Sequence, residues 1–242
     1  MRYLVTVGPY VPEVLILVLV ATLAQSVFGL FRRYVNTQAS AQFALFAAAN
    51  GMEWRNGQDR SVLALPFDFL RQGDGRGVDD VMAGTWKGLS IEAAHYWYYD
   101  QGDRGNRTYH HFTILATALP LQVPYLGIQQ QNVLTQAAEL IGMTGLQFES
   151  EEFNRQYKVV AKERPFAYQV IDTSMISWLL GPGAGFNFAL NDRYLLMWVH
   201  RIMDPQGLGP LFNAARGFVD TIPQLVWQEY GNRPPTVTQQ AS

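Results

Sequence analysis

Three of the chain's four histidines lie close together in the sequence, at His95, His110 and His111. Imidazole nitrogens bind zinc and transfer protons near neutral pH, so this cluster is the first candidate for chemistry. A zinc site, however, needs three or four converging ligands, and adjacent strand residues such as His110 and His111 project to opposite faces of a sheet. Glu92 is expected on the face opposite His95, so no carboxylate completes a site. The sequence therefore predicts no bound metal and no other cofactor.

The sequence lacks the usual motifs of nucleophilic and phosphate chemistry. It has no cysteine, no G-x-S-x-G and no H-E-x-x-H. The glycine-rich run at 181–185 has no Lys-Ser/Thr pair and follows a predicted helix, which indicates a turn. The acidic residues at 149–152 could pair for acid–base catalysis, but an acidic run beside a turn is usually a solvated face. A hydrolase that uses the clustered histidines stays open, and it requires His95 and His110 within hydrogen-bonding reach of a carboxylate or a metal.

The clustered histidines are positioned by a predicted antiparallel hairpin. Its strands, at 89–99 and 108–118, are rich in β-branched and aromatic residues, and the loop at 100–107 is rich in Gly and Asp. If Tyr99 pairs with Thr108, the alternation of side chains divides the hairpin into two faces. One face then carries His95, Trp97, Tyr99, His110 and Phe112, and the other carries Tyr96, Tyr98, Tyr109 and His111. A slip of one residue would exchange these partners.

The hairpin contains a run of four aromatic residues, from 96 to 99. A strand with aromatic side chains on both faces must bury both faces or leave one exposed. Burial of both faces is one interpretation. The other is an exposed contact surface, because tyrosine and tryptophan are enriched in interface hot spots. In that case we predict that Tyr96, Tyr98 and Tyr109 contact a protein partner.

The segments around this hairpin predict an α+β fold built on an antiparallel sheet with packed helices. Further strands are expected at 52–55, 63–69 and 81–87. The polar, glycine-rich segment at 72–80 is predicted to be a mobile, exposed loop. Pro120 and Pro124 are expected to end this first lobe, which spans residues 51–130.

A second lobe, of mixed α and β structure, is predicted over residues 131–232. Its expected elements are a helix at 132–141, strands at 146–149 and 157–161, a helix at 165–180, and a hairpin of 186–190 and 194–200 around Asn191-Asp192. The last helix is expected to kink or restart at Pro223. Residues 233–242 are polar and are predicted to form a disordered tail.

The stretch from 14 to 31 is the only one long and apolar enough to cross a bilayer, which takes roughly 20 mostly apolar residues. The residues spaced along this predicted span are Val14, Leu17, Val20, Leu23, Val27 and Phe31. A cleaved signal peptide and a buried core helix are the alternatives. Arg32 and Arg33 follow the span and favour a cytoplasmic C-terminal domain. Residues 1–33 are thus predicted to be a tail and a single transmembrane helix that contacts lipid of the cell membrane.

A helix is predicted to continue from the membrane over residues 34–50, and Asn50-Gly51 is expected to close it. Phe43 and Phe46 lie on the apolar stripe of this juxtamembrane helix. The stripe is either a docking face for a membrane partner or an ordinary part of the core, and the sequence leaves both interpretations open.

Charge and cysteine content limit the classes of partner. The chain carries a formal net charge of −2 and has a pI near 6.1, so it offers no basic surface for nucleic acid. The absence of cysteine excludes disulfides and thiolate metal sites.

Two segments resemble a family of uncharacterised actinobacterial single-pass membrane proteins. They are GMEW at 51–54 and the longer, more specific run FESEEFNRQYKV at 148–159. The likeness extends over most of the chain and includes an N-terminal span, a His/Tyr-rich hairpin and a terminal helix with WQEY at 227–230. The resemblance implies this architecture. Because the family has no established activity, it supplies no catalytic residues.

These observations favour a membrane-anchored, non-enzymatic adaptor or accessory subunit of a larger membrane protein complex. The predicted anchor, the helix stripe and the missing catalytic motifs all agree with this function. A lipid or small apolar ligand-binding module is a second hypothesis, which requires an apolar cavity between the sheet and the terminal helix. The hydrolase described above is the third.

Overall fold

The computed structural model describes residues 40–57, 61–103, 105–131 and 145–231. The chain divides into two units, residues 1–45 and residues 46–242. Residues 40–49 are helical. Gly51 follows with a φ of 62°, the left-handed conformation that commonly closes a helix, as the sequence predicts.

Several predictions fall outside the described residues. They are the membrane span with Val14, Leu17, Val20, Leu23, Val27 and Phe31, the helix at 132–141 and the tail at 233–242. Within the described part of the chain, no helix combines the length and the apolar character needed to cross a membrane.

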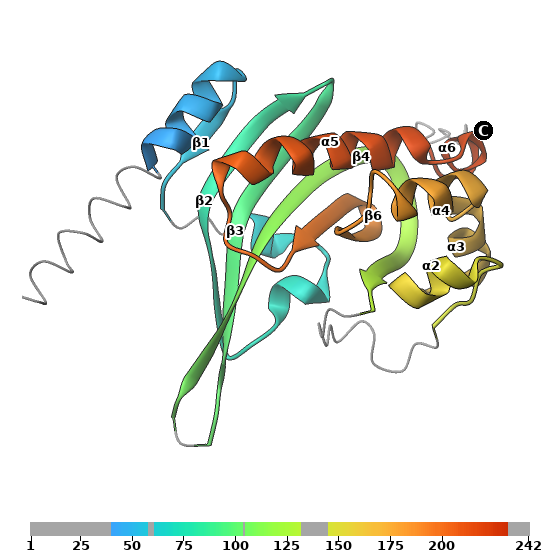
Figure 1. Ribbon diagram of the computed structural model, residues 1–242, viewed down its shortest axis with the longest axis horizontal. Helices are drawn as coiled ribbons and strands as arrows, with labels where there is room; N and C mark the ends of the chain where they lie inside the picture. The colour runs from blue at the N-terminus through green and yellow to red at the C-terminus, as the bar shows by residue number, and fades with distance from the viewer. Residues whose placement is uncertain (1–39, 58–60, 104, 132–144, 232–242) are drawn as a thin grey trace, which may run out of the picture. The chain divides into compact units, whose positions relative to one another are not determined.

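The described strands form one antiparallel sheet, in the order β1-β2-β3-β4-β5, with β6 also paired to β4 (Figure 1). The strands are β1 (Glu53–Arg55), β2 (Gly75–Trp86), β3 (Leu89–Gln101), β4 (Arg107–Gln130), β5 (Tyr157–Ala161) and β6 (Asn187–Val199). Since β5 and β6 both pair with β4, the segments predicted as two lobes share a single sheet. The predicted strand at 157–161 is confirmed, whereas the one at 146–149 is reduced to a single bridge between Leu146 and Val159.

The expectation that Pro120 and Pro124 end the sheet is wrong, because β4 continues through both to Gln130. The pairing of β4 with β6 shifts register between Ala118 and Val123, and again between Val123 and Leu126. Both prolines lie within these irregular intervals, where the ladder does not need their missing N–H groups.

The hairpin predicted around Asn191-Asp192 is also wrong, because β6 is one continuous strand. Asp192 pairs with Val123 at the irregular part of the ladder and has a φ of 54°. The extra residues of this ladder lie on β4, where 119–122 face only Arg193 and 124–125 face only Asn191, so β4 is the bulged strand and β6 follows it without a break.

Five helices follow or separate the later strands: α2 (Glu151–Gln156), α3 (Arg164–Val170), α4 (Thr173–Leu180), α5 (Pro205–Thr221) and α6 (Gln224–Tyr230). The single helix predicted at 165–180 is divided into α3 and α4. Asp172 interrupts it, because its carboxylate accepts a hydrogen bond from the Met175 N–H at 2.8 Å and starts a new helix.

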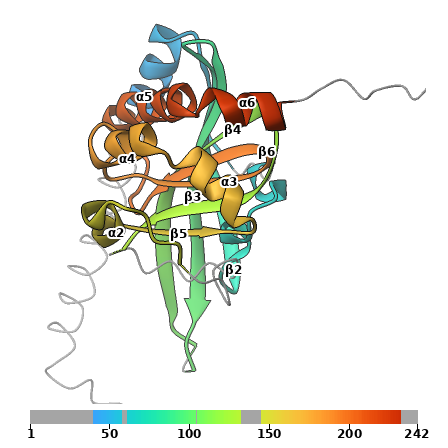
Figure 2. The same cartoon turned by 90° about the vertical axis from the view of Figure 1, so that its right-hand side faces the viewer.

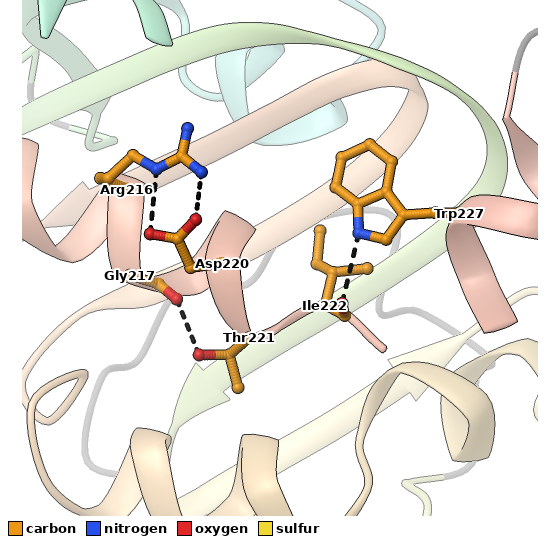
Figure 3. Close-up of polar contacts among 6 residues, drawn as sticks. All are labelled: Arg216, Gly217, Asp220, Thr221, Ile222 and Trp227. Carbon is orange, nitrogen blue, oxygen red and sulfur yellow. Dashed lines mark hydrogen bonds and ion pairs between the residues drawn. The ribbon is translucent and has the colours of Figure 1, made fainter. Parts of the chain in front are cut away.

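The restart predicted at Pro223 is confirmed, and side chains on both sides hold it (Figure 3). The Thr221 hydroxyl donates to the Gly217 carbonyl at 2.7 Å, and the Trp227 indole N–H donates to the Ile222 carbonyl at 3.2 Å. Arg216 pairs with Asp220 on the exposed side of α5. The Thr221 and Arg216 contacts therefore hold the last turns of α5, and the bond from Trp227 to Ile222 connects α6 to the end of α5 across the proline.

The sheet has a core on each side. α5 lies on one side, and two 3₁₀ turns, Val62–Ala64 and Asp68–Arg71, lie on the other (Figure 2). On the side of the turns, Phe69 stacks on Trp198 with ring centroids 4.7 Å apart and meets Phe112 edge-on at 5.1 Å. This buried aromatic cluster fixes the base of β3 and β4.

Candidate functional site

β2, β3 and β4 extend beyond the helices as a three-stranded arm (Figure 1). Their register differs from the predicted one by one residue, since Tyr99 pairs with Tyr109 and Thr108 pairs with Asp100. On β2, the partners of Tyr99 and Trp97 are Gly75 and Gly77. The segment predicted as a mobile loop at 72–80 therefore contains the beginning of a strand.

The corrected register redistributes the side chains between the two faces of the arm. One face, here called the aromatic face, carries His95, Trp97, Tyr99, Tyr109 and His111. The other carries Tyr96, Tyr98, His110 and Phe112, beside the buried cluster around Phe69.

The predicted contact surface of Tyr96, Tyr98 and Tyr109 is accordingly corrected. Tyr96 is fully buried and its hydroxyl donates to the Phe69 carbonyl at 3.1 Å, while Tyr98 is only 7% exposed. Burial raises the pKa of both phenols. Tyr109 lies on the opposite face and is 48% exposed. Of the three predicted residues, Tyr109 alone is available to a partner.

The predicted docking stripe on the first helix is not exposed either. The Phe43 side chain is 4% exposed, and the Phe46 ring lies 6.0 Å from the Phe212 ring of α5 in an edge-on contact.

The rings of the aromatic face lie across the backbone of β2. A Cβ atom at Gly77 would come within 2.5 Å of the Trp97 indole, and one at Gly75 within 2.4 Å of the Tyr99 phenol ring. No side chain other than hydrogen fits under either ring without displacing it. The two glycines therefore let Trp97 and Tyr99 lie on the sheet, which explains why a glycine-rich segment forms a strand here.

Neighbouring rings extend this layer across the arm. The Tyr109 centroid lies 5.4 Å from that of Tyr99 and 5.9 Å from that of Trp97. The His111 ring lies nearly parallel to that of Tyr109, at 6.2 Å and 14°. Rings from β3 thus cover the glycines of β2, and rings from β4 extend the layer beside them.

Polar groups stand at both ends of the aromatic face. The Trp97 indole N–H donates to the Asp79 carboxylate at 2.7 Å, and the Arg107 guanidinium lies 4.5 Å above the Tyr99 ring. The carboxylate fixes the rotation of the indole, and the cation–π contact places one positive charge at the tip.

α5 covers the continuation of this face but not the aromatic face itself. The bulge between Asp79 and Met82 brings Trp86 to the side of Trp97, and the Trp86 ring lies 5.5 Å from that of Phe212 on α5. Thr113, the partner of His95, donates to the carbonyl of Arg201, four residues before α5 begins. The helix therefore starts where the aromatic face ends.

His95 and His111 form the polar centre of the face. The His95 Nε2 lies 3.0 Å from the His111 Nδ1, and the two rings are stacked at 5.2 Å. One nitrogen must donate and the other accept, so the bond requires at least one neutral ring. Burial is the main cause that lowers the pKa of His95, His111 lowers it further, and Asp79 opposes both.

This lowered pKa predicts that stability falls in mild acid. In the unfolded chain the His95 side chain has an ordinary pKa near 6.5. Below that pH the unfolded chain therefore binds more protons than the folded chain. The contribution of neutral His95 to the free energy of unfolding is therefore fully present above about pH 6.5. It is lost as the pH falls through the lowered pKa of the folded state. Urea unfolding should give a lower free energy of unfolding at pH 5.5 than at pH 7.5, and this difference should be smaller in His95→Asn. The control Tyr168→Phe should keep the wild-type difference. A wild-type pH dependence in His95→Asn would contradict the assignment.

The other hairpin histidine lies on the opposite face. The His110 Nε2 is 3.1 Å from the Asp100 carboxylate, at an exposed position near the tip. The hydrolase hypothesis requires both His95 and His110 within hydrogen-bonding reach of a carboxylate or a metal. His110 meets this requirement through Asp100, whereas the hydrogen bond of His95 is to His111. Among the described residues, no three His, Asp or Glu side chains lie close enough together to hold a metal ion.

Among the open grooves in the described part of the chain, two lie away from the arm and bear on the lipid-binding hypothesis. The larger, of about 830 Å³, runs between the start of α5 and the segment before β6, and Asn187, Arg201 and Asp204 line it. The smaller, of about 370 Å³, lies between Val62 and Tyr194. Both grooves mix polar with apolar side chains, unlike the apolar cavity that the lipid-binding hypothesis requires.

No protein-family model and no curated protein matches this chain. The solved structure of the mycobacterial trehalose monomycolate transport factor A, TtfA, is similar, with a TM-score of 0.56 over 76% of this chain and 95% of that chain. The two sequences are 8% identical, so the similarity concerns the fold alone. The mycobacterial origin of this neighbour agrees with the actinobacterial part of the sequence resemblance. The chain is thus an α+β protein with the fold of a mycobacterial transport factor.

Proposed function

We propose that this chain is a non-enzymatic accessory subunit of a larger membrane complex, anchored in the cell membrane by residues 14–31 with its C-terminal domain in the cytoplasm. The observation that carries the proposal is the arm, which brings a layer of aromatic side chains beyond the helices. An enzyme encloses its substrate in a cleft, whereas no residue of the aromatic face lines either groove described above. Such a surface is suited to binding a partner rather than to catalysing a reaction.

The structural neighbour supports the same class of function. TtfA is named as a transport factor for trehalose monomycolate, and it shares the fold over 95% of its chain. In this proposal the present chain is likewise a factor that assists a membrane process, with the aromatic face directed to what the complex handles.

The anchor is tested by membrane fractionation of the full-length chain. We expect wild-type protein in the membrane fraction, and Val20→Arg/Leu23→Arg should release it, because each charge near the centre of a span costs roughly 2.5–3.5 kcal/mol of insertion free energy. Leu225→Arg is the matched control, since Leu225 is 49% exposed and lies on α6. Release of the wild-type protein without detergent would contradict the anchor.

The complex is tested by native mass measurement in a mild detergent. We expect the full-length chain to run with an integral membrane protein in a fixed ratio, and that protein, when tagged, should recover the chain in return. A chain that migrates alone at its own mass of 27.3 kDa plus detergent would overturn the accessory function.

A further inference from the structure

We infer that the aromatic face binds the pyranose ring of an uncharged sugar, carried as the head group of a membrane glycolipid. The inference deepens the proposed function and rests on it for the membrane source of the sugar. The binding surface itself is argued from the arm alone.

The first argument is the way the rings are presented. Trp97 and Tyr99 lie over Gly77 and Gly75, so one ring face of each rests on the backbone. The Arg107 guanidinium already lies over the Tyr99 ring, so the ring offered to a ligand is that of the partly exposed Trp97. A gluco-configured pyranose has flat faces that consist of axial C–H bonds, whose slight positive charge matches the negative face of an aromatic ring. The Tyr109 ring stands beside the other two, inclined by 53° to Trp97 and by 52° to Tyr99, so the platform is the Trp97 ring bordered by Tyr109.

The second argument is the set of hydrogen-bonding groups beside the platform. One oxygen of Asp79 accepts from Trp97, and its other oxygen has no hydrogen-bond partner among the described residues. The Tyr99 and Tyr109 hydroxyls likewise have none within the described part of the chain. A carboxylate oxygen and two phenol groups around an apolar surface suit a ligand that has hydroxyl groups at its rim and C–H bonds on its face.

The third argument is charge. Asp79 and Arg107 stand at opposite ends of the platform, and Arg107 is already engaged with the Tyr99 ring. A nucleic acid would need several cations to follow its phosphates beside the stacked bases, and the face does not offer them in its described residues. A phosphorylated sugar would meet the Asp79 carboxylate. The balanced charge therefore favours a neutral ligand.

The direct test is saturation-transfer NMR of the full-length protein with methyl α-D-glucopyranoside and maltose. We expect millimolar binding, at least ten times weaker in Trp97→Ala and Tyr109→Ala. Sorbitol has hydroxyl groups without a ring face, and glucose 6-phosphate adds charge, so both should bind more weakly. Tyr168→Ala is the matched control, because Tyr168 is 46% exposed on α3, away from the arm.

A second variant separates the shape of the platform from its chemistry. Gly77→Ala keeps every aromatic side chain but forces the Trp97 ring off the backbone, so binding should fall as it does in Trp97→Ala. Circular dichroism and the unfolding midpoint establish that each variant is folded. Equal affinity in wild type, Trp97→Ala and Gly77→Ala, or no saturable binding of either sugar, would overturn the inference.

The lipid source is tested in nanodiscs of phosphatidylcholine with and without a glucosyl diacylglycerol. The glycolipid should slow hydrogen exchange of the arm peptides around Trp97 and Tyr109 in the wild type, and it should not do so in Trp97→Ala. Binding of free sugars without protection by the glycolipid would overturn the head-group assignment. Absence of sugar binding in the wild type, with the membrane complex intact, would refute this inference and leave the proposed accessory function standing.

Discussion

Replacing Phe69 with alanine should lower the free energy of unfolding by about 3–5 kcal/mol, the range found for truncation of a buried phenylalanine. Phe69 is 2% exposed and packs against Trp198, Phe112 and Tyr96, whose ring centroids lie 4.7, 5.1 and 5.4 Å away. The substitution removes a ring that touches three strands, and rigid neighbours cannot fill the space. Equilibrium denaturation in urea measures the loss.

The matched control for Phe69→Ala is Tyr109→Ala, on the other face of the same arm. Tyr109 is 48% exposed, so its truncation should cost about 1 kcal/mol or less. A small loss in Phe69→Ala, or a comparable loss in both variants, would show that the buried cluster does not support the base of the arm.

Replacing Asn187 with alanine should destabilise the protein by about 2–3 kcal/mol, because two backbone groups lose their partner in the interior. Asn187 is 1% exposed, its amide oxygen accepts from the Gln130 N–H at 2.9 Å, and its amide nitrogen donates to the Trp198 carbonyl at 3.2 Å. Asn187, the first residue of β6, thus connects Gln130 at the end of β4 to Trp198 near the end of β6. The expected readout is a lower urea midpoint and faster hydrogen exchange of the Gln130 amide.

Asn213→Ala is the control for this prediction. The Asn213 side chain is exposed on α5 and accepts from Lys87 at 2.8 Å, so water can replace that contact. Asn213→Ala should therefore lower the free energy of unfolding by about 0.5 kcal/mol or less. Rapid exchange at Gln130 in the wild type would contradict the structural role given to Asn187.

The sequence by itself determined the local elements. The hairpin between β3 and β4 is specified by a Gly/Asp loop between two runs of strand formers, and the break at Pro223 by the missing N–H of proline. The strand at Tyr157–Ala161 follows from its composition in the same way. These elements depend on residues close together in the chain, so a local pattern is sufficient to predict them.

Only the tertiary structure decided which face of the arm is exposed. Aromatic residues occupy both sides of β3, so binary patterning cannot distinguish the pairing of Tyr99 with Tyr109 from its pairing with Thr108. The choice is made by Phe69, which belongs to a turn distant in sequence and packs against Tyr96 and Phe112. Burying that side leaves Trp97, Tyr99 and Tyr109 for the aromatic face.

The same reason explains the elements that the sequence predicted incorrectly. Gly75 and Gly77 look like loop residues until the rings of Tyr99 and Trp97 are placed over them, and Pro124 looks like a strand end until β6 is placed beside the bulged part of β4. In each case the deciding partner lies on another strand. Local propensity thus defined the segments, whereas contacts between strands, which propensity does not contain, fixed their register, their continuity and the surface offered to a ligand.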